Sequence, residues 1–506
     1  MERSSHYYEK EIKKNQREFF RLVNKIPKAT SDAQKQRLAW AAMHHANGRP
    51  TDVFSSDIIE KVFLDLAQQN SIPLAEEFDK GTVLHVMSEA YTYGGHTRCV
   101  ERWISLWPEH RHSCIVLRQR RSVAFPELLQ EKVEASGGQM IVNFHNPNDS
   151  KLKIALRLRE LASRYEHIVL HIHVDPIPII AFGTPEFKRP IIYFNHATHI
   201  FWAGISIADH VADLGSCSHD ITTKYRGARA SSILGIPVDD NINSLNLDKT
   251  EARRAMNIPA HAKVVLSSGS HQKFAPIGSP SFKEVVSDIL SAHPDAVFYI
   301  AGVERNNYFW PELKKRFPDR LVIYGKLDYS TEYLQLLAAS DLVIDSYPVG
   351  GGTAIIDAVK AGKPVLTLHT FFQSDYLLNS KASCSTYEEF KEKAYRILHE
   401  PAYGDEIYQD VYKSWLEHLN PEAWRARCQA IYDSLPECHQ IHDFTTPAPP
   451  AQITRVTLIT SRWATVLPPH KFREKRRKFF RIRIKKHEVI IRLFGHDLIN
   501  TRSKRA

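Results

Sequence analysis

The sequence predicts an α/β protein built around two doubly wound parallel sheets. Short, almost continuously apolar segments alternate with helical segments from Gly81 onward, as strands do when helices cover both faces of a parallel sheet. The alternation stops in a polar stretch at about 236–260 and then restarts. A glycine loop in the second half follows an apolar segment and leads into a helix. We therefore predict two Rossmann-like domains in series, facing each other across a cleft.

The chain divides into four predicted regions. Residues 1–78 are polar and helical in pattern and form a helical N-terminal extension. Residues 79–240 form a first Rossmann-like domain, and residues 241–440 form a second one. Residues 441–506 combine a proline-rich linker with a basic tail.

The expected elements follow from the apolar pattern in chain order. In the first domain, strands are predicted at 82–87, 112–117, 139–144, 167–173 and 190–195, with another at 211–215 and helices at 97–106, 126–135 and 151–165. In the second domain, strands are predicted at 263–269, 296–302, 320–325, 341–345 and 365–368, with helices at 281–292, 310–316, 331–339 and 353–361. Ligands of such sheets bind at the carboxyl ends of the strands, so we expect the site between the two domains.

Composition narrows the class of protein. The chain has 506 residues, of which 43% are apolar and 25% charged, as in a soluble globular protein. No apolar run reaches the roughly 18–20 residues of a membrane helix, and the polar start does not resemble a signal peptide. Six scattered cysteines without a CxxC pair argue against a disulfide framework or a structural zinc site. We expect a cytoplasmic protein.

The net charge of +10 belongs to the tail. From His470 to Ala506 there are fourteen basic and three acidic residues, a surplus of eleven, so the preceding residues carry about −1. The body is nearly neutral, and the sequence predicts no specific binding of nucleic acid.

The glycine loop at 346–353 predicts an anion site. A strand at 341–345 precedes three successive glycines, and Thr353 is the expected N-cap of the following helix. Backbone N–H groups and the helix dipole at such a junction favour a phosphate. Asp357 lies one turn further on, where a carboxylate can accept hydrogen bonds from a ribose. The alternative is an ordinary strand–turn–helix.

Two further loops of the second domain end at the same predicted edge. The first, 267–274, carries Ser270 and Lys273, and the lysine is suited to a phosphate. The second, 325–333, carries Tyr333, an aromatic side chain that can hold a base. Together with the glycine loop they predict a nucleoside diphosphate site. The alternative for Lys273 is a solvated loop lysine.

Histidines gather at predicted strand ends of the first domain. His96 lies in a glycine turn at a helix start, His173 and Asp175 follow one strand, and His196 and His199 follow another. Strand ends converge on one cleft, so these residues are the candidates for catalysis, although a single histidine there is more often structural. The HxH spacing also suits a metal, but acidic partners of clear geometry are lacking. We therefore predict no metal site and no cofactor.

The segments SGSHQKF and DLVIDSYPVGGGTAIIDAVKAGKPVLTL resemble the donor-binding half of GT-B glycosyltransferases. They look most like the branch of the O-linked N-acetylglucosamine transferases and bacterial adhesin glycosyltransferases. Over residues 81–435, approximately, the order of the predicted strands and helices agrees with that family. The sequence motifs themselves are specific only within 263–368. It implies that Lys273 contacts the donor diphosphate.

The same resemblance implies further roles around the glycine loop. Gly351, Gly352 and Thr353 would hold the phosphates, and Asp357 the ribose. The histidine of that branch's motif is replaced here by glycine. No tetratricopeptide pattern is present in the N-terminal extension, so a protein acceptor is not carried over.

The resemblance also bears on the mechanism. Many retaining GT-B enzymes carry a glutamate eight residues before the position of Asp357, and Val349 stands there in this chain. We therefore expect inversion, with His96 as the first candidate for the base, then His196 and His173. Lys273 and the loop amides would stabilise the leaving diphosphate. No DxD motif stands at a convincing strand end, which favours metal independence.

The leading prediction is a glycosyltransferase that moves a sugar from a nucleotide sugar, expected to be a UDP-sugar, to a glycan, lipid-linked or protein acceptor. One alternative is a nucleotide-sugar 2-epimerase of the same fold. Another is a non-catalytic carbohydrate- or nucleotide-binding module tethered by its tail.

The basic tail at 471–494 interleaves eleven basic residues with apolar ones. The alternation at 480–485 suits a strand, and the longer segment also suits an amphipathic helix. Both arrangements favour an anionic membrane surface. The alternative is a solvated basic tail that adheres to nucleic acid without specificity.

Overall fold

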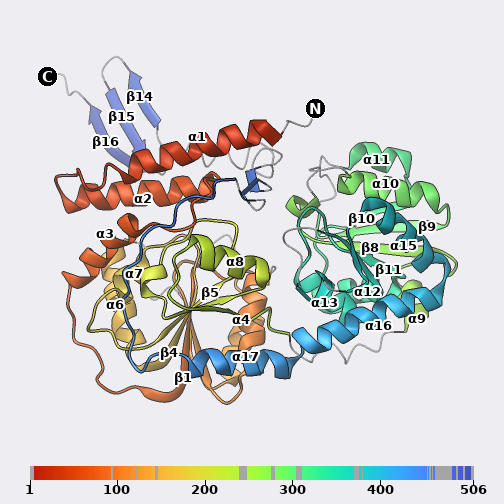
Figure 1. Cartoon of the computed structure of the whole chain (residues 1–506), viewed down its shortest axis with the longest axis horizontal. Helices are drawn as coiled ribbons and strands as arrows, with labels where there is room; N and C mark the ends of the chain where they lie inside the picture. Colours follow the sequence, from red (N-terminus) through yellow and green to blue (C-terminus); the bar gives the residue numbers. More distant parts are fainter. Residues whose placement is uncertain are drawn as a thin grey trace.

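The structure of the protein is a computed structural model. It describes residues 5–92, 95–119, 124–142, 146, 148–238, 248–274, 280–303, 310–369, 375–378, 380–452, 454, 457–458, 460–461, 481–485, 488–493 and 496–502. Figure 1 shows two α/β domains side by side, with three N-terminal helices lying over the first. Within the described residues, no helix combines the length and the apolar run that crossing a bilayer requires.

The first domain is built on a seven-stranded parallel sheet in the order β3-β2-β1-β4-β5-β6-β7. The strands are β1 (Asp79–Met87), β2 (Arg111–Val116), β3 (Met140–Val142), β4 (Tyr165–His171), β5 (Ile191–Asn195), β6 (His210–Asp213) and β7 (Ser231–Ile233). The helices are α4 (Gly95–Leu106), α5 (Glu127–Ala135), α6 (Lys151–Ala162), α7 (Ile177–Phe182) and α8 (Ser216–Tyr225). Strand β5 is buried throughout, and β1 and β4 are buried over their carboxyl-terminal parts, because helices cover both faces of the sheet there.

The N-terminal helices are part of the first domain's core. They are α1 (Ser5–Val23), α2 (Asp32–Gly48) and α3 (Asp57–Gln68). Phe19 is fully buried and packs against Phe201 at a ring distance of 5.7 Å. The buried carboxylate of Glu60 on α3 accepts hydrogen bonds from the backbone N–H groups of Gly204, Ile205 and Ser206. Those bonds tie the helices to the loop after β5.

The second domain holds a six-stranded parallel sheet in the order β10-β9-β8-β11-β12-β13. The strands are β8 (Lys263–Ser268), β9 (Ala296–Ala301), β10 (Leu321–Ile323), β11 (Leu342–Ile344), β12 (Val365–Leu368) and β13 (Ser383–Cys384). The helices are α9 (Lys249–Ala255), α10 (Phe282–Ala292), α11 (Pro311–Arg316), α12 (Leu334–Ala339), α13 (Thr353–Lys360), α14 (Asp375–Leu378), α15 (Tyr387–His399) and α16 (Pro401–His418).

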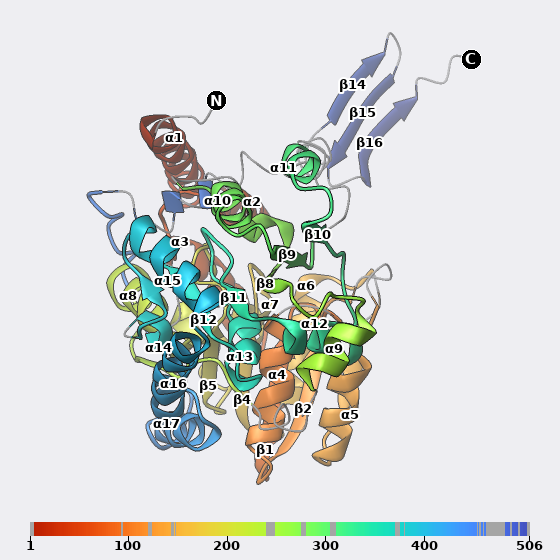
Figure 2. The same ribbon diagram turned by 90° about the vertical axis from the view of Figure 1, so that its right-hand side faces the viewer.

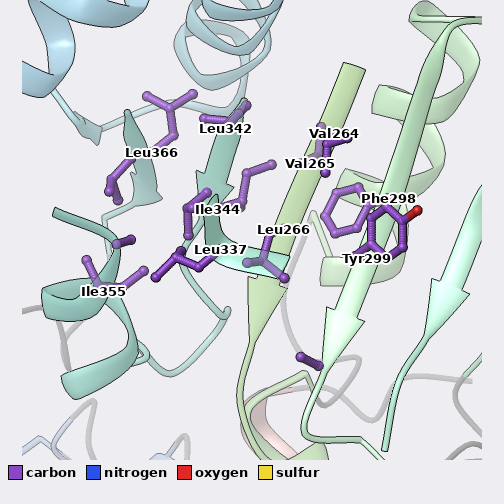
Figure 3. Close-up of a cluster of buried hydrophobic side chains, with 14 of the residues drawn as sticks. Val264, Val265, Leu266, Phe298, Tyr299, Leu337, Leu342, Ile344, Ile355 and Leu366 are labelled. Carbon is purple, nitrogen blue, oxygen red and sulfur yellow. The ribbon is translucent and has the colours of Figure 1, made fainter. Parts of the chain in front are cut away.

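Figure 3 shows apolar side chains of neighbouring strands packing in the second sheet, among them Leu266 on β8 and Ile344 on β11. The two predicted doubly wound domains are thus confirmed. In the second sheet the strand order reverses between β8 and β11, and the loops that follow these two strands lie at the carboxyl edge where such sheets bind ligands.

The chain returns to the first domain at its end. Helix α16 runs into α17 (Pro421–Asp433), and Figure 1 shows the pair extending along the lower edge of both domains. Trp424, Cys428 and Tyr432 on α17 are buried in one cluster with Trp103 on α4. Residues 421–440 were assigned to the second domain from the sequence, and this assignment is corrected for α17. Its apolar stripe covers the first domain, a long-range contact that no local pattern reveals.

The proline-rich segment after α17 is also held by the first domain. Asp209 accepts a hydrogen bond from the backbone N–H of Gln440 and pairs with the His439 ring at 2.7 Å. The backbone N–H of His442 donates to the Ser206 carbonyl. The segment is therefore anchored over its first residues and is not a free linker there.

The tail contains a three-stranded antiparallel sheet of β14 (Arg481–Lys485), β15 (Glu488–Leu493) and β16 (His496–Arg502). Figure 2 shows these strands as a separate ribbon outside the two domains. The strand interpretation therefore holds over 481–485, and the helical alternative does not. Residues 471–480, 486–487 and 494–495 lie outside the described residues.

Candidate active site

The glycine loop connects β11 to α13, as predicted, but its cap differs. Gly352 has φ of +56°, a left-handed conformation that side chains disfavour, and is the residue before the helix. Thr353 is the first helical residue, and no side chain caps the helix. The prediction of Thr353 as N-cap is thus wrong. The backbone N–H groups at this helix start have no capping side chain and can serve an anion.

A buried carboxylate holds the loop in place. Asp345, directly after β11, accepts a hydrogen bond from the backbone N–H of Gly351 at 2.5 Å. A β-carbon at Gly351 would lie 2.9 Å from the same carboxylate oxygen, so the close approach requires glycine. Burial raises the pKa of Asp345 to about 6, although the Gly351 N–H and Lys273 oppose this. Sequence reasoning used Asp345 only as a strand end, yet its place before the glycines was a usable signal.

Lys273 reaches the glycine loop. It lies in the single turn η3 (His271–Phe274), and its Nζ donates to the Gly350 carbonyl oxygen at 2.6 Å. Burial lowers the pKa of Lys273, and the nearby Asp345 acts in the opposite direction. The side chain is therefore a half-buried cation held against the loop, in contrast to the solvated lysine of the alternative reading.

The other two predicted donor residues, Ser270 and Tyr333, differ in their exposure to solvent. Ser270 is exposed in the loop that carries Lys273. Tyr333, in the turn η4 (Tyr329–Tyr333), is buried in the core of the second domain, and its hydroxyl pairs with that of Ser268 at 3.1 Å. The Tyr333 ring is thus a packing group, so the prediction that it offers a face to a base is corrected.

Asp357 is engaged by the first domain. Its carboxylate accepts a hydrogen bond from Arg102 on α4 at 3.2 Å, and both side chains are buried. Burial raises the pKa of Asp357, while Arg102 and the Tyr329 hydroxyl oppose the rise. Arg98 lies over the Tyr329 ring at 4.6 Å. The carboxylate predicted to accept from a ribose therefore forms an ion pair between the domains in this structure.

The starts of α4 and α13 face each other across the two domains. A β-carbon at Gly95 would lie 4.0 Å from Cγ2 of Thr353. His96, the next residue, is half-buried. The predicted glycine turn before it includes Tyr93 and Gly94, which lie outside the described residues.

Three of the predicted histidines meet at this place. The ring centroids of His96 and His196 are 4.2 Å apart, those of His173 and His196 4.6 Å, and those of His96 and His173 5.2 Å. The expected convergence is confirmed, because β4 and β5 are adjacent strands whose carboxyl ends share one edge.

Hydrogen bonds define the tautomers of two of these rings. The Nε2 of His96 lies 3.2 Å from the His171 carbonyl oxygen, which can only accept, so Nε2 carries the proton and Nδ1 is bare. This Nδ1 is buried and has no hydrogen-bond partner among the described residues. In the same way Nδ1 of His196 donates to the Phe194 carbonyl, so its Nε2 accepts from Nε2 of His173 at 3.3 Å.

The environment keeps all three rings neutral at pH 7. Burial is the main cause and lowers the pKa of His96 to about 3, with His173 adding to the effect. Burial also lowers the pKa of His173, and that of His196 lies well below its ordinary value. A neutral imidazole with a bare nitrogen is the form that accepts a proton.

The remaining two predicted catalytic residues, His199 and Asp175, are not members of this group of three histidines. Burial lowers the pKa of His199 to about 4, and the neighbouring Arg226 adds to this effect. Asp175 is buried, forms an ion pair with Arg118, and accepts from the backbone N–H of Ile177 at the start of α7. The carboxylate of Asp175 is thus engaged by a helix start and an arginine.

Sequence reasoning missed a chain of buried histidines under the cluster. Nδ1 of His85 lies 3.0 Å from Nε2 of His171, and Nε2 of His85 lies 3.0 Å from Nδ1 of His112. His112 in turn donates from Nε2 to the Trp107 carbonyl oxygen. The three residues come from β4, β1 and β2, and only the strand order brings them together.

A cavity of about 570 Å³ lies at the carboxyl edge of the second sheet beside Tyr347 and His369. Its lining includes the acidic residues Glu284, Asp288 and Glu388. These carboxylates would repel a diphosphate, so this cavity is unsuited to one.

Among solved structures, the chain is similar to Alr3699/HepE of Anabaena in complex with UDP and glucose. The TM-score is 0.54 at 15% identity, over 70% of this chain and 99% of that one. The complex of the same protein with UDP gives 0.52 at 14% identity, over 70% and 100% of the two chains. The chain has the GT-B fold. At these identities the likeness concerns the fold alone.

In this GT-B fold the histidine cluster and the glycine loop come from different domains. No family model matches the chain. A curated relative is 33% identical over 147 residues, namely the UDP-N-acetylglucosamine–N-acetylmuramyl-(pentapeptide) pyrophosphoryl-undecaprenol N-acetylglucosamine transferase of Desulforudis audaxviator (strain MP104C). The match spans 27% of this chain and 36% of that relative, so the chain covers about a third of the relative's length.

Proposed function

We propose that this protein is a glycosyltransferase that moves a sugar from a uridine diphosphate sugar to an acceptor. The observation that carries the proposal is the bare, buried Nδ1 of His96 at a helix start that faces the glycine helix of the other domain. The similarity to a solved protein that binds UDP and glucose supports this donor, and the match to an N-acetylglucosamine transferase supports the reaction class.

The proposed donor site lies in the second domain. The backbone N–H groups at the start of α13 bind the diphosphate, and Lys273 exchanges its bond to the Gly350 carbonyl for one to a phosphate oxygen. Both groups are in place before the donor arrives. The interaction of each group with the diphosphate becomes more favourable as negative charge grows on this leaving group. The ribose contact of Asp357 requires this carboxylate to exchange Arg102 for the sugar.

The proposed chemistry is an inverting displacement without a metal on the diphosphate. His96 Nδ1 accepts the proton of the acceptor nucleophile, a bond forms between that nucleophile and the anomeric carbon, and the bond to the diphosphate oxygen breaks. The positive charge of Lys273 stabilises the negative charge that develops on the leaving diphosphate. The buried Val349 at the position of the retaining enzymes' glutamate supports inversion.

The proposed acceptor is a glycan, a lipid-linked sugar or a protein, approached from the first domain. We also propose that the tail contacts an anionic membrane surface. Its register places Ile482 opposite Ile491 and Ile484 opposite Val489, between positions with basic residues. Flotation with anionic and neutral vesicles tests this, comparing the full chain with one ending at Ser461, which retains the bonds of Thr454 and Thr457 to Asp52. Equal flotation of both chains would contradict it.

The function is tested by incubating the protein with UDP-sugars, with and without panels of glycan, lipid-linked and peptide acceptors. We expect acceptor-dependent release of UDP, lowered about 10²- to 10⁴-fold in His96→Ala while UDP still binds. Isomerisation of the donor without an acceptor would identify the 2-epimerase. Absence of any turnover with retained binding would favour a binding module.

A further inference from the structure

The cluster of His96, His173 and His196 has a geometry that donor chemistry does not require. One ring nitrogen from each residue can be chosen so that all three lie within 4.8 Å of one another. The Nε2 atoms of His173 and His196 are 3.3 Å apart. Tetrahedral zinc with Zn–N bonds of about 2.0–2.1 Å needs ligand nitrogens about 3.3–3.4 Å apart. This pair already has the required separation.

The hydrogen bonds around the cluster are those that orient metal-binding histidines. A ligating imidazole commonly donates its other ring N–H to a backbone carbonyl or a carboxylate, which directs the bare nitrogen toward the metal. His96 donates from Nε2 to the His171 carbonyl, and His196 donates from Nδ1 to the Phe194 carbonyl. Both acceptors are backbone atoms next to or within β4 and β5, so they are fixed by the sheet.

The bare nitrogen of His96 is a second, independent observation. Its Nδ1 is buried and has no partner among the described residues, and leaving a buried acceptor unsatisfied is unfavourable. A bound cation satisfies this lone pair.

We propose that His96, His173 and His196 form a site for a divalent transition metal of the zinc type. Imidazole nitrogens suit Zn²⁺, Co²⁺, Ni²⁺ and Cu²⁺ and do not suit Mg²⁺ or Ca²⁺. Binding requires His173 to transfer its proton from Nε2 to Nδ1, because Nε2 carries the proton in the hydrogen bond to His196. Water completes the coordination. The site lies in the first domain and is separate from the diphosphate.

Metal binding has a consequence for catalysis, and this consequence alone rests on the proposed function. The metal takes the lone pair of His96 that would accept the acceptor's proton. Zn²⁺ therefore inhibits transfer, and a chelator restores it. The metal acts as an inhibitor of the base and takes no part in the transfer.

The test is a binding measurement on the chelator-treated full chain. Co²⁺ is titrated and followed by the visible absorption of tetrahedral cobalt, and Zn²⁺ by calorimetry. We expect one ion per chain and at least a tenfold loss of affinity in His173→Ala and in His196→Ala. Controls are His261→Ala, an exposed histidine of the second domain, and Cys438→Ser, an exposed thiol. Both controls should bind as the parent does.

The outcomes separate the two proposals. Absence of stoichiometric binding, or parental affinity in the double variant His173→Ala/His196→Ala, overturns the metal site. If an alanine variant shows a lowered melting temperature without metal, the same titration is made with His173→Gln and His196→Gln. Metal binding without inhibition of transfer leaves the metal site intact and argues against His96 as the base.

Discussion

At the scale of single residues, Lys273 and Asp345 both bind the backbone of the glycine loop. Lys273 donates to the carbonyl of Gly350, and Asp345 accepts from the amide of Gly351. The lysine holds a positive charge over the loop, while the carboxylate fixes the loop backbone. Their separate roles lead to separate predictions.

Lys273→Ala should weaken UDP binding by about 10- to 100-fold, since a hydrogen bond between charged groups contributes about 1.5–3 kcal/mol. Calorimetric titration with UDP measures the change. Lys315→Ala removes an exposed lysine of the same domain and should bind UDP as the parent does. Parental affinity in Lys273→Ala would contradict our placement of the phosphates.

Asp345 should make stability depend on pH. Its pKa is raised from 3.8 to about 6 in the folded state, so between these values the folded chain binds more protons than the unfolded chain. Stability contributed by the protonated form is therefore present below about pH 4 and is lost as the pH rises to about 6. The total is about 3 kcal/mol. Asp345→Asn, which keeps an acceptor for Gly351, should remove this decline.

Melting temperatures measured from pH 4 to pH 7 test the prediction for Asp345, with Asp295→Asn, an exposed aspartate, as the control. The difference between parent and Asp345→Asn should grow with pH, and the control should follow the parent. A constant difference would show that the carboxylate does not titrate in this range.

At the scale of elements, the junction of β11 and α13 depends on backbone conformation. Gly352 has φ of +56° and Gly362, just after the other end of α13, has φ of +71°. Around Gly352 the nearest atom to an added β-carbon is 3.9 Å away, and around Gly362 none lies within 4 Å. At both positions, therefore, the positive φ angle disfavours a side chain, although there is room for a β-carbon.

Gly352→Ala and Gly362→Ala should each destabilise the protein by about 1–2 kcal/mol, which is the cost of a left-handed conformation for alanine. Only Gly352→Ala should also weaken UDP binding, because only its N–H lies at the helix start. Thermal unfolding and UDP titration on the two variants separate the effects. Equal UDP affinity in both would place the diphosphate elsewhere.

At the scale of the whole molecule, a buried ion pair joins the two domains. Arg102 lies on α4 of the first domain and Asp357 on α13 of the second, and each side chain is about 5% exposed. Removing one partner of a buried pair costs about 3–5 kcal/mol while the other stays buried. Separation of the domains avoids this cost by returning the carboxylate to water.

Arg102→Ala should therefore open the cleft and increase the radius of gyration measured by small-angle X-ray scattering. Arg111→Ala, which removes an exposed arginine paired with Asp79 within the first domain, should leave it unchanged. An unchanged radius with an unchanged melting temperature in Arg102→Ala would show that the pair does not hold the domains together.

The sequence by itself determined the parts of this protein that depend on local pattern. Apolar runs such as 263–269 and 341–345 predicted strands because a strand buried on both faces needs apolar residues throughout. Three glycines after a strand predicted the loop that Asp345 and Lys273 hold. Histidines at the ends of adjacent parallel strands predicted the cluster, since parallel strands end at one edge.

Only the tertiary structure decided which partners these residues have. Asp175 forms an ion pair with Arg118 and accepts a hydrogen bond at the start of α7, and Asp357 forms an ion pair with Arg102. Helix α17 packs against the first domain. Each of the last two contacts joins residues more than two hundred positions apart. The bare nitrogen of His96 likewise follows from the distant His171 carbonyl. Periodicity describes which face of an element is buried, whereas the packing of elements against one another determines what each polar atom meets.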